Sequence, residues 1–208
     1  MIRESDGRIA GVILAGGQAT RMGGGDKGLR TISGRPMIAH VIARLAPQVD
    51  AMAINANGVP DRWAAFGLPV IADGVSGFQG PLAGILAGMH WAAKNGFSAV
   101  ATVAADTPFF PRTLVQGLRD AAGEPGVCIA TSLDEGGQMQ THPTFGLWPV
   151  SLHNDLATAL AAGHRKVSVW ADRQKAGRAF FAGPADPFFN VNTPADLKQA
   201  ETMAQLFE

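Results

Sequence analysis

The sequence is poor in the residues that build disulfides and zinc sites. Its single cysteine, Cys128, excludes an internal disulfide, and its apolar surroundings predict a small buried residue. The cysteine and the five histidines show neither C-x-x-C nor H-x-x-x-H spacing, so zinc is not expected. Any metal should be a hard ion with oxygen ligands. A single unpaired thiol suits a reducing, cytoplasmic setting.

Net charge and long apolar runs are also missing. The 17 basic residues balance the 17 acidic residues, so no overall field would recruit nucleic acid or an anionic membrane. No apolar run approaches the roughly 20 residues that span a bilayer, and the N-terminus has no apolar signal region. We therefore expect a soluble cytoplasmic protein that binds neither nucleic acid nor membranes. Anion binding should be local.

Short apolar runs alternate with segments of helical spacing along the 208 residues. Strands buried on both faces are expected at 9–14, 51–54, 69–72, 99–104, 127–131 and 144–147. Helices are expected at 37–45, 82–94, 113–122 and 151–162. This order predicts an α/β fold with three layers, a mostly parallel twisted sheet with helices on both faces. Without a repeat or linker, one domain should cover 1–208.

A glycine-rich loop follows the first expected strand. Residues 13–27 read ILAGGQATRMGGGDK, with Arg21 and Lys27 among the glycines. Glycines let backbone amides approach an anion and the cations neutralise its charge, so the loop predicts a phosphate cradle for a nucleotide. It is not a Walker A loop, because Lys27 lacks a preceding Gly and a following Ser or Thr. It is not a dinucleotide fingerprint, because Gln18 stands where a glycine is needed.

Polar residues follow three further strands. Asn55, Asp73 and Asp106 each come at the end of an apolar run. The carboxyl ends of parallel strands meet at one edge of a sheet, where such folds bind ligands. Each residue alone could be an ordinary turn former. Their succession behind the glycine loop favours a binding site.

The C-terminal region carries a helix-start signal. Thr193, Pro194 and Asp196 form a capping-box pattern. Asn190 and Asn192 lie just before it and follow an apolar pair, which suggests a turn facing something polar. Capping and ligand contact remain equally open for these two asparagines.

The glycine loop resembles the signature of nucleotidyltransferases, and L-A-G-G followed by R-M-G-G-x-D-K is similar to the molybdenum cofactor guanylyltransferase family. Segments 49–57, 80–84, 106–109, 142–144 and 190–196 match that family's pattern in order. The resemblance covers nearly the whole chain and implies a Rossmann-like nucleotidyltransferase fold. It also implies transfer of GMP from GTP to the terminal phosphate of molybdenum-bound molybdopterin, with pyrophosphate released. Further implied partners are cofactor-biosynthesis proteins and molybdoenzyme chaperones.

Nucleotidyl transfer requires charge neutralisation around the triphosphate. Arg21 and Lys27 are the expected clamp for the β- and γ-phosphates, and Asp106 is the expected Mg²⁺ ligand. One carboxylate suits an ion that keeps several waters and binds substrate phosphates; the simpler role for Asp106 is to cap a turn. The acceptor phosphate is already anionic, so no protein base is required. His142 fits a structural role as easily as a base.

Contacts to the nucleotide and the acceptor complete the expected site. The backbone amides of Leu14, Ala15, Gly16 and Gly17 should approach the nucleotide. Asn55 and Asp73 are also expected there, Asp73 accepting from ribose hydroxyls or from guanine, with both alternatives open. In the resembled family guanine selection goes with Gly16 and with the segment containing Gly80 and Gly84. Asn190, Asn192 and the loop 134–140 are expected at the acceptor.

Three alternatives compete with this interpretation. A cytidylyltransferase would share the fold, although such relatives typically carry L-A-A-G and a serine before the arginine. A sugar-phosphate nucleotidyltransferase has a related loop but is usually longer. A GTP-binding carrier without catalysis would not need a metal ligand together with a cationic clamp.

Overall fold

A seven-stranded sheet forms the centre of the molecule, in the order β5-β4-β1-β6-β8-β7-β9. The computed structural model describes residues 7–16, 25–74, 80–134, 136–183 and 186–207. The strands are β1 Ile9–Leu14, β2 Thr31–Ile32, β3 Arg35–Pro36, β4 Ala51–Asn55, β5 Val70–Ile71, β6 Ala99–Ala104, β7 Cys128–Leu133, β8 Met139–Pro149 and β9 Gly177–Phe180. The α-helices are α1 Met37–Leu45, α2 Pro81–Lys94, α3 Leu114–Ala121, α4 His153–Ala161, α5 Val167–Arg173 and α6 Pro194–Phe207.

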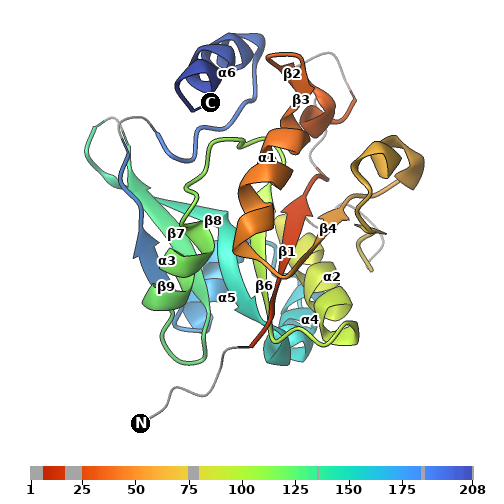
Figure 1. Cartoon of the computed structure of the whole chain (residues 1–208). Helices are drawn as coiled ribbons and strands as arrows, with labels where there is room; N and C mark the ends of the chain where they lie inside the picture. Colours follow the sequence, from red (N-terminus) through yellow and green to blue (C-terminus); the bar gives the residue numbers. More distant parts are fainter. Residues whose placement is uncertain (1–6, 17–24, 75–79, 135, 184–185, 208) are drawn as a thin grey trace.

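Helices cover both faces of this sheet (Figure 1). Helices α1 and α3 pack on one face over a core that includes Ile13, Phe110 and Leu118. Helices α2, α4 and α5 pack on the other face, where Trp148 and Trp170 are buried. Successive β1 residues alternate between these two cores, as a strand buried on both faces requires. The expected three-layer α/β fold is confirmed.

The sheet is mostly parallel, as expected. Strands β5, β4, β1 and β6 run parallel, and β9 is parallel to β7. Strand β8 is the exception, because it pairs antiparallel with both β6 and β7. It is also longer than the expected run at 144–147, since its first half is exposed and carries no apolar signal. The carboxyl ends of β1, β4, β5 and β6 therefore share one edge.

Four elements were not anticipated from the sequence. Strands β2 and β3 have two residues each, too few for a recognisable run. Strand β9 is four residues long, and α5 is a seven-residue helix that contains Val167 and Val169 and so lacks a clear helical pattern. Helix α6 packs on β2 through Ile32, Val191 and Met203, which places it above the carboxyl edge of the sheet (Figure 1).

Cys128 is fully buried, as expected. Burial raises the pKa of its thiol to about 11, so the thiol stays neutral and inert. Within the described part of the chain, no helix is both long and apolar enough to cross a membrane.

Candidate active site

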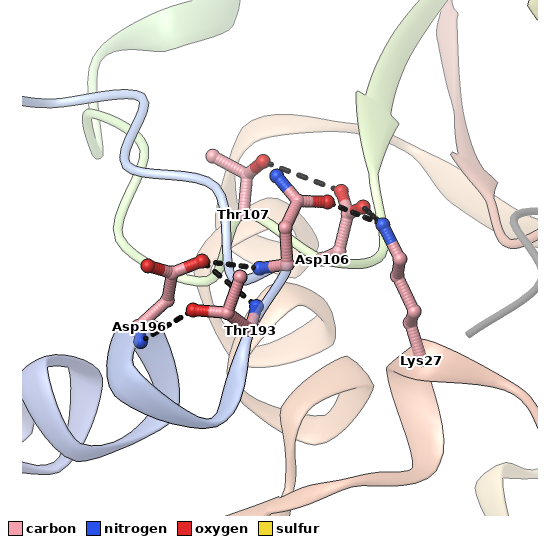
Figure 2. A network of polar contacts seen from close by, with 6 residues as sticks. Lys27, Asp106, Thr107, Thr193 and Asp196 are labelled. Atoms are coloured by element: carbon pink, nitrogen blue, oxygen red, sulfur yellow. Dashed lines mark hydrogen bonds and ion pairs between the residues drawn. The ribbon is translucent and has the colours of Figure 1, made fainter. Parts of the chain in front are cut away.

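Lys27 and Asp106 form a contact at the carboxyl edge of the sheet. Lys27 begins a short 3-10 helix, Lys27–Leu29, while Asp106 follows β6, and the Nζ to Oδ2 distance is 3.3 Å. Lys27 also donates to the side-chain oxygen of Asn192, which lies 165 residues further along the chain. Figure 2 shows the Lys27 and Asp106 side chains pointing toward each other from separate segments. We call Lys27, Asp106 and Asn192 the edge triad.

The start of α6 holds Asn192 in place. Asp196 accepts the backbone amides of Asn192 and Thr193, both at 2.8 Å, and its own amide donates to the Thr193 hydroxyl at 3.1 Å (Figure 2). This reciprocal capping box confirms the expected helix start. Burial would raise the pKa of Asp196, but these hydrogen bonds outweigh it and keep the pKa below its usual value. The Val191 amide donates to the Asp106 carbonyl at 2.9 Å, which ties the segment to β6.

Asn192 and Asn190 have different surroundings. The side-chain oxygen of Asn192 accepts a hydrogen bond from Lys27. Asn190 is exposed, and its side chain is not part of the triad. The structure thus brings only one of the two expected asparagines to Asp106.

A second polar cluster forms where β4 and β5 end. The buried Asn55 side chain donates to the Ile71 carbonyl at 3.1 Å and to Asp73 Oδ1 at 2.9 Å. Asn57 donates to Asp73 Oδ2 at 2.8 Å and accepts the Asp73 amide at 2.9 Å. The Asp73 carboxylate is thereby fixed by two amides, with both oxygens oriented. Asn57 was missed from the sequence, although its spacing two residues beyond Asn55 was visible.

A glycine of helix α2 is needed for this cluster, and a second glycine precedes the helix. A Cβ at Gly84 would lie 2.2 Å from Asn55 Oδ1, so any side chain there would displace the asparagine. Gly80 precedes the helix with φ +70 and ψ −171, a conformation that favours glycine. The role expected from the sequence was to leave room beside a base. The structure adds that Gly84 makes room for Asn55 itself.

The backbone at the end of β1 is only partly available to a ligand. The Ala15 amide donates to the Asn55 carbonyl at 2.8 Å, because pairing with β4 continues one residue past the strand. This amide is therefore engaged within the sheet, and its approach to a nucleotide stays a prediction. Leu14 is the last residue of β1. Gly16 is exposed, and no described atom would lie within 4 Å of a Cβ there. Arg21 and Gly17 lie outside the described residues.

An arginine that the sequence analysis missed also touches this edge. Arg62 lies in the 3-10 helix Pro60–Phe66, and its Nε is 2.5 Å from Asp26 Oδ2. Asp26 directly precedes Lys27. No spacing in the sequence pointed to this pair, because it depends on how the 3-10 helix folds back toward the loop.

His142 occupies a structural position. Its Nε2 lies 2.8 Å from the Ser132 hydroxyl, and its ring stacks on Phe188 with centroids 4.2 Å apart. Burial lowers the pKa of His142, although Asp186 opposes the shift, so the ring is neutral near pH 7. These contacts favour packing over a role as a base.

A cavity of about 630 Å³ is lined by residues of β7, β8, β9 and α6 and of the segments that follow β7 and β9. Its walls include Asp134, Gln140 near the start of β8 and Phe180 at the end of β9, together with Phe189 and Met203. Phe189 is three residues from Asn192, and three residues of extended chain span at most about 11 Å. The Cα atom of Phe189, one wall of the cavity, therefore lies within about 11 Å of the Cα atom of Asn192.

The oxygen ligands at this edge suit a hard divalent ion. The Asp106 carboxylate is partly exposed, and its nearest protein contacts are Lys27 and the Thr107 hydroxyl at 3.5 Å. Among the described residues no group of three or more His, Cys, Asp or Glu could hold a metal. A single carboxylate fits an ion that takes its other ligands from water and substrate phosphates.

The chain is closely similar to known guanylyltransferases. Residues 11–176 match the family described as a MobA-like NTP transferase domain. The molybdenum cofactor guanylyltransferase of Bradyrhizobium sp. (strain ORS 278) is 48% identical over 202 residues, which cover 95% of this chain and 94% of the relative. That of Rhodopseudomonas palustris (strain BisB5) is 50% identical over 197 residues, covering 93% and 92%.

Solved structures share the fold. Molybdopterin-guanine dinucleotide biosynthesis protein A from Archaeoglobus fulgidus superposes with a TM-score of 0.72 at 22% identity, covering 95% of this chain and 99% of that one. A 4-diphosphocytidyl-2C-methyl-D-erythritol synthase from Anaerococcus prevotii gives 0.68 at 13% identity, covering 96% of each chain. At such identities the likeness concerns the fold alone. Together with the sequence matches, it means that the chain belongs to the MobA-like nucleotidyltransferases and, among them, to the molybdenum cofactor guanylyltransferase family.

Proposed function

We propose that this protein transfers GMP from GTP to the terminal phosphate of molybdenum-bound molybdopterin, which yields the guanine dinucleotide cofactor and pyrophosphate. One observation carries the proposal. The edge triad and the Asn55–Asp73 cluster, drawn from five separate parts of the chain, are built around residues at the carboxyl ends of parallel strands. This is the edge at which α/β sheets bind nucleotides. A cytoplasmic location, where Cys128 stays reduced, is part of the proposal.

Lys27 binds the phosphates in this mechanism. Its ammonium group already lies between the oxygens of Asp106 and Asn192, so its position is fixed before substrate arrives. It would neutralise charge on the β- and γ-phosphates as pyrophosphate departs. Arg21, on the same loop in the sequence, is proposed as the second cation of this clamp.

Asp106 is proposed to hold Mg²⁺. Such an ion, when bound, would supply positive charge against the charge that develops on the leaving group. Lys27 orients Asp106 from one side and the Thr107 hydroxyl lies on the other. The backbone link from Val191 to the Asp106 carbonyl keeps this carboxylate at the end of β6.

Asn55, Asp73 and the glycines of 80–84 are proposed to hold the nucleoside. Asp73 is fixed by two asparagine amides, so its carboxylate can accept from ribose hydroxyls or from the N–H groups of guanine. No described atom would crowd a Cβ at Gly16, which would let the ring approach the backbone. Guanine is preferred here because the sequence relatives are named guanylyltransferases.

The acceptor is proposed to lie between the edge triad and the cavity. Its phosphate would sit at Asn192, in line with the α-phosphorus, and its ring system would enter the cavity beside Phe180 and Phe189. A phosphate monoester is largely ionised near pH 7 and can attack without a protein base. Asn190, which is exposed and lies between Phe189 and Asn192 in the sequence, is proposed to contact the body of the acceptor.

Pyrophosphate release tests this function. The purified protein is incubated with Mg²⁺, each of the four nucleoside triphosphates in turn, and molybdopterin loaded with molybdate. We expect release with GTP only, and only when the acceptor is present. Preference for CTP would reassign the protein to the cytidylyltransferases, and GTP binding without release would favour a carrier.

The acceptor site has its own test. An Asn190→Ala/Asn192→Ala variant should lose bound pterin, measured by its fluorescence after filtration. Asn190→Ala alone is the sharper probe, because it leaves the contact between Asn192 and Lys27 intact. Full pterin retention in both variants would remove these asparagines from the acceptor site.

A further inference from the structure

Arg62 lies between the phosphate side and the nucleoside side of the proposed site. Its Nε is 2.5 Å from Asp26 Oδ2. Asp26 precedes the short 3-10 helix that begins with Lys27, yet its carboxylate makes no capping hydrogen bond there and is turned to Arg62 instead. The position of the residue before Lys27 is thus set by an arginine 36 positions away.

The two terminal nitrogens of Arg62 contact the backbone on the nucleoside side of the proposed site. Nη1 donates to the Val59 carbonyl at 2.6 Å, and Nη2 donates to the Asn57 carbonyl. The side-chain nitrogen of the same Asn57 donates to the Asp73 carboxylate, and its side-chain oxygen accepts the Asp73 backbone amide. One guanidinium group therefore connects the Lys27 segment with the cluster around Asp73.

Packing keeps this bridge rigid. The Arg62 guanidinium lies over the fully buried Trp63 ring, 5.5 Å from its centroid. A Cβ on Gly28 would lie 3.5 Å from the same tryptophan and 3.2 Å from the Ala105 methyl, so the chain just after Lys27 is packed closely. The Lys27 segment is held on one side by Arg62 and on the other by this packing.

The charge of Asp26 gives Arg62 a second role. The side chains of Arg62 and Asp26 are 28% and 24% exposed, so water screens their pairing only in part. Without Arg62, the Asp26 carboxylate would lose the cation that pairs with it among the described residues, and it stands one residue from the lysine that receives a highly charged triphosphate. Its repulsion would oppose nucleotide binding directly.

We propose that Arg62 is a positioning residue for nucleotide binding. It neutralises Asp26 and fixes Lys27 relative to Asn57 and Asp73, without itself touching the nucleotide. The proposal rests on GTP being the substrate of this edge.

Titration calorimetry with GTP and Mg²⁺ tests this role without an acceptor. Arg62→Met should weaken GTP binding about tenfold, and the deficit should shrink at high salt because the repulsion from Asp26 is screened. The double variant Asp26→Asn/Arg62→Met should recover most of the affinity. Arg178→Met is the matched control, because Arg178 pairs with the exposed Asp172 near β9, the strand at the opposite edge of the sheet. This variant should bind GTP with wild-type affinity.

Three outcomes decide whether Arg62 promotes nucleotide binding or only stabilises the local fold. Wild-type affinity in Arg62→Met overturns the proposal. A loss of GTP affinity that Asp26→Asn does not rescue and that salt does not change also overturns the proposal, because a structural defect would give that result. Failure of the wild-type protein to bind GTP would instead overturn the proposed function, and this inference with it. Thermal melting of each variant establishes that the fold is intact.

Discussion

Gly84→Ala is the substitution for which the structure gives the sharpest expectation. The new Cβ would lie 2.2 Å from Asn55 Oδ1 and 2.9 Å from Leu14 Cδ2. The leucine can rotate away, but Asn55 is only 4% exposed and is tied to Ile71 and Asp73. The alanine therefore has to push the asparagine out of its two hydrogen bonds.

The expected cost follows from those bonds. A hydrogen bond to a neutral carbonyl is worth about 1 kcal/mol, and one to a carboxylate about 1.5–3 kcal/mol. Alanine recovers up to about 1 kcal/mol through its better helix propensity. The net loss should be about 2 kcal/mol, which lowers the melting temperature of a chain of this length by about 4–8 °C. GTP binding should weaken as well, because Asp73 loses one of its two amide partners.

A double-mutant cycle measures how much of this cost comes from the clash with Asn55, by chemical unfolding and by GTP titration. On an Asn55→Ala background the clash is absent, so Gly84→Ala should cost nothing or stabilise the helix slightly. The reasoning is refuted if Gly84→Ala alone is as stable as the wild type. An equal cost on both backgrounds would also refute it, because the penalty would then come from somewhere other than Asn55.

Three further predictions concern the edge triad and His142. Lys27→Ala should raise the KM for GTP at least tenfold while the melting temperature changes little, because the lysine side chain is partly exposed on a short 3-10 helix; unchanged steady-state kinetics would exclude it from the clamp. Asp106→Asn should abolish turnover and the response to added Mg²⁺ together in a pyrophosphate-release assay, and wild-type kinetics would move the metal elsewhere. Burial lowers the pKa of His142, so its neutral form stabilises the fold above pH about 6.5 and this stability is lost as the pH falls further. A His142→Gln variant should therefore lose less stability than the wild type between pH 7 and 5, and parallel melting curves across that range would show that His142 does not contribute.

Helices and strands with a regular apolar pattern over their whole length were predictable from the sequence. The bounds of β1, β6 and α1 agree with the expected 9–14, 99–104 and 37–45, because each pattern ends at a glycine, a proline or a polar turn. Strand β9 could not be predicted, because its four residues gain their structure from pairing with β7, about 50 positions away. The direction of β8 is likewise set by its neighbours and not by its own residues.

The candidate site was predictable where it follows strands. Asn55, Asp73 and Asp106 were found because strand ends in a parallel sheet converge at one edge. Asn57 and Arg62 were missed because their contacts depend on a turn and a 3-10 helix that bring them back over that edge. The engaged amide of Ala15 was missed for a related reason, since nothing in a sequence shows how far strand pairing continues.

Transfer of a labelled phosphate tests the central claim most directly. The protein is incubated with Mg²⁺, molybdenum-loaded molybdopterin and GTP labelled either at the α- or at the γ-phosphate, and the products are separated. The account predicts that the α-label enters a guanine dinucleotide of the pterin, that the γ-label leaves as pyrophosphate, and that Lys27→Ala greatly reduces both. An α-label that stays on free guanine nucleotide while GTP is bound, or that enters product only when supplied as CTP, would contradict it.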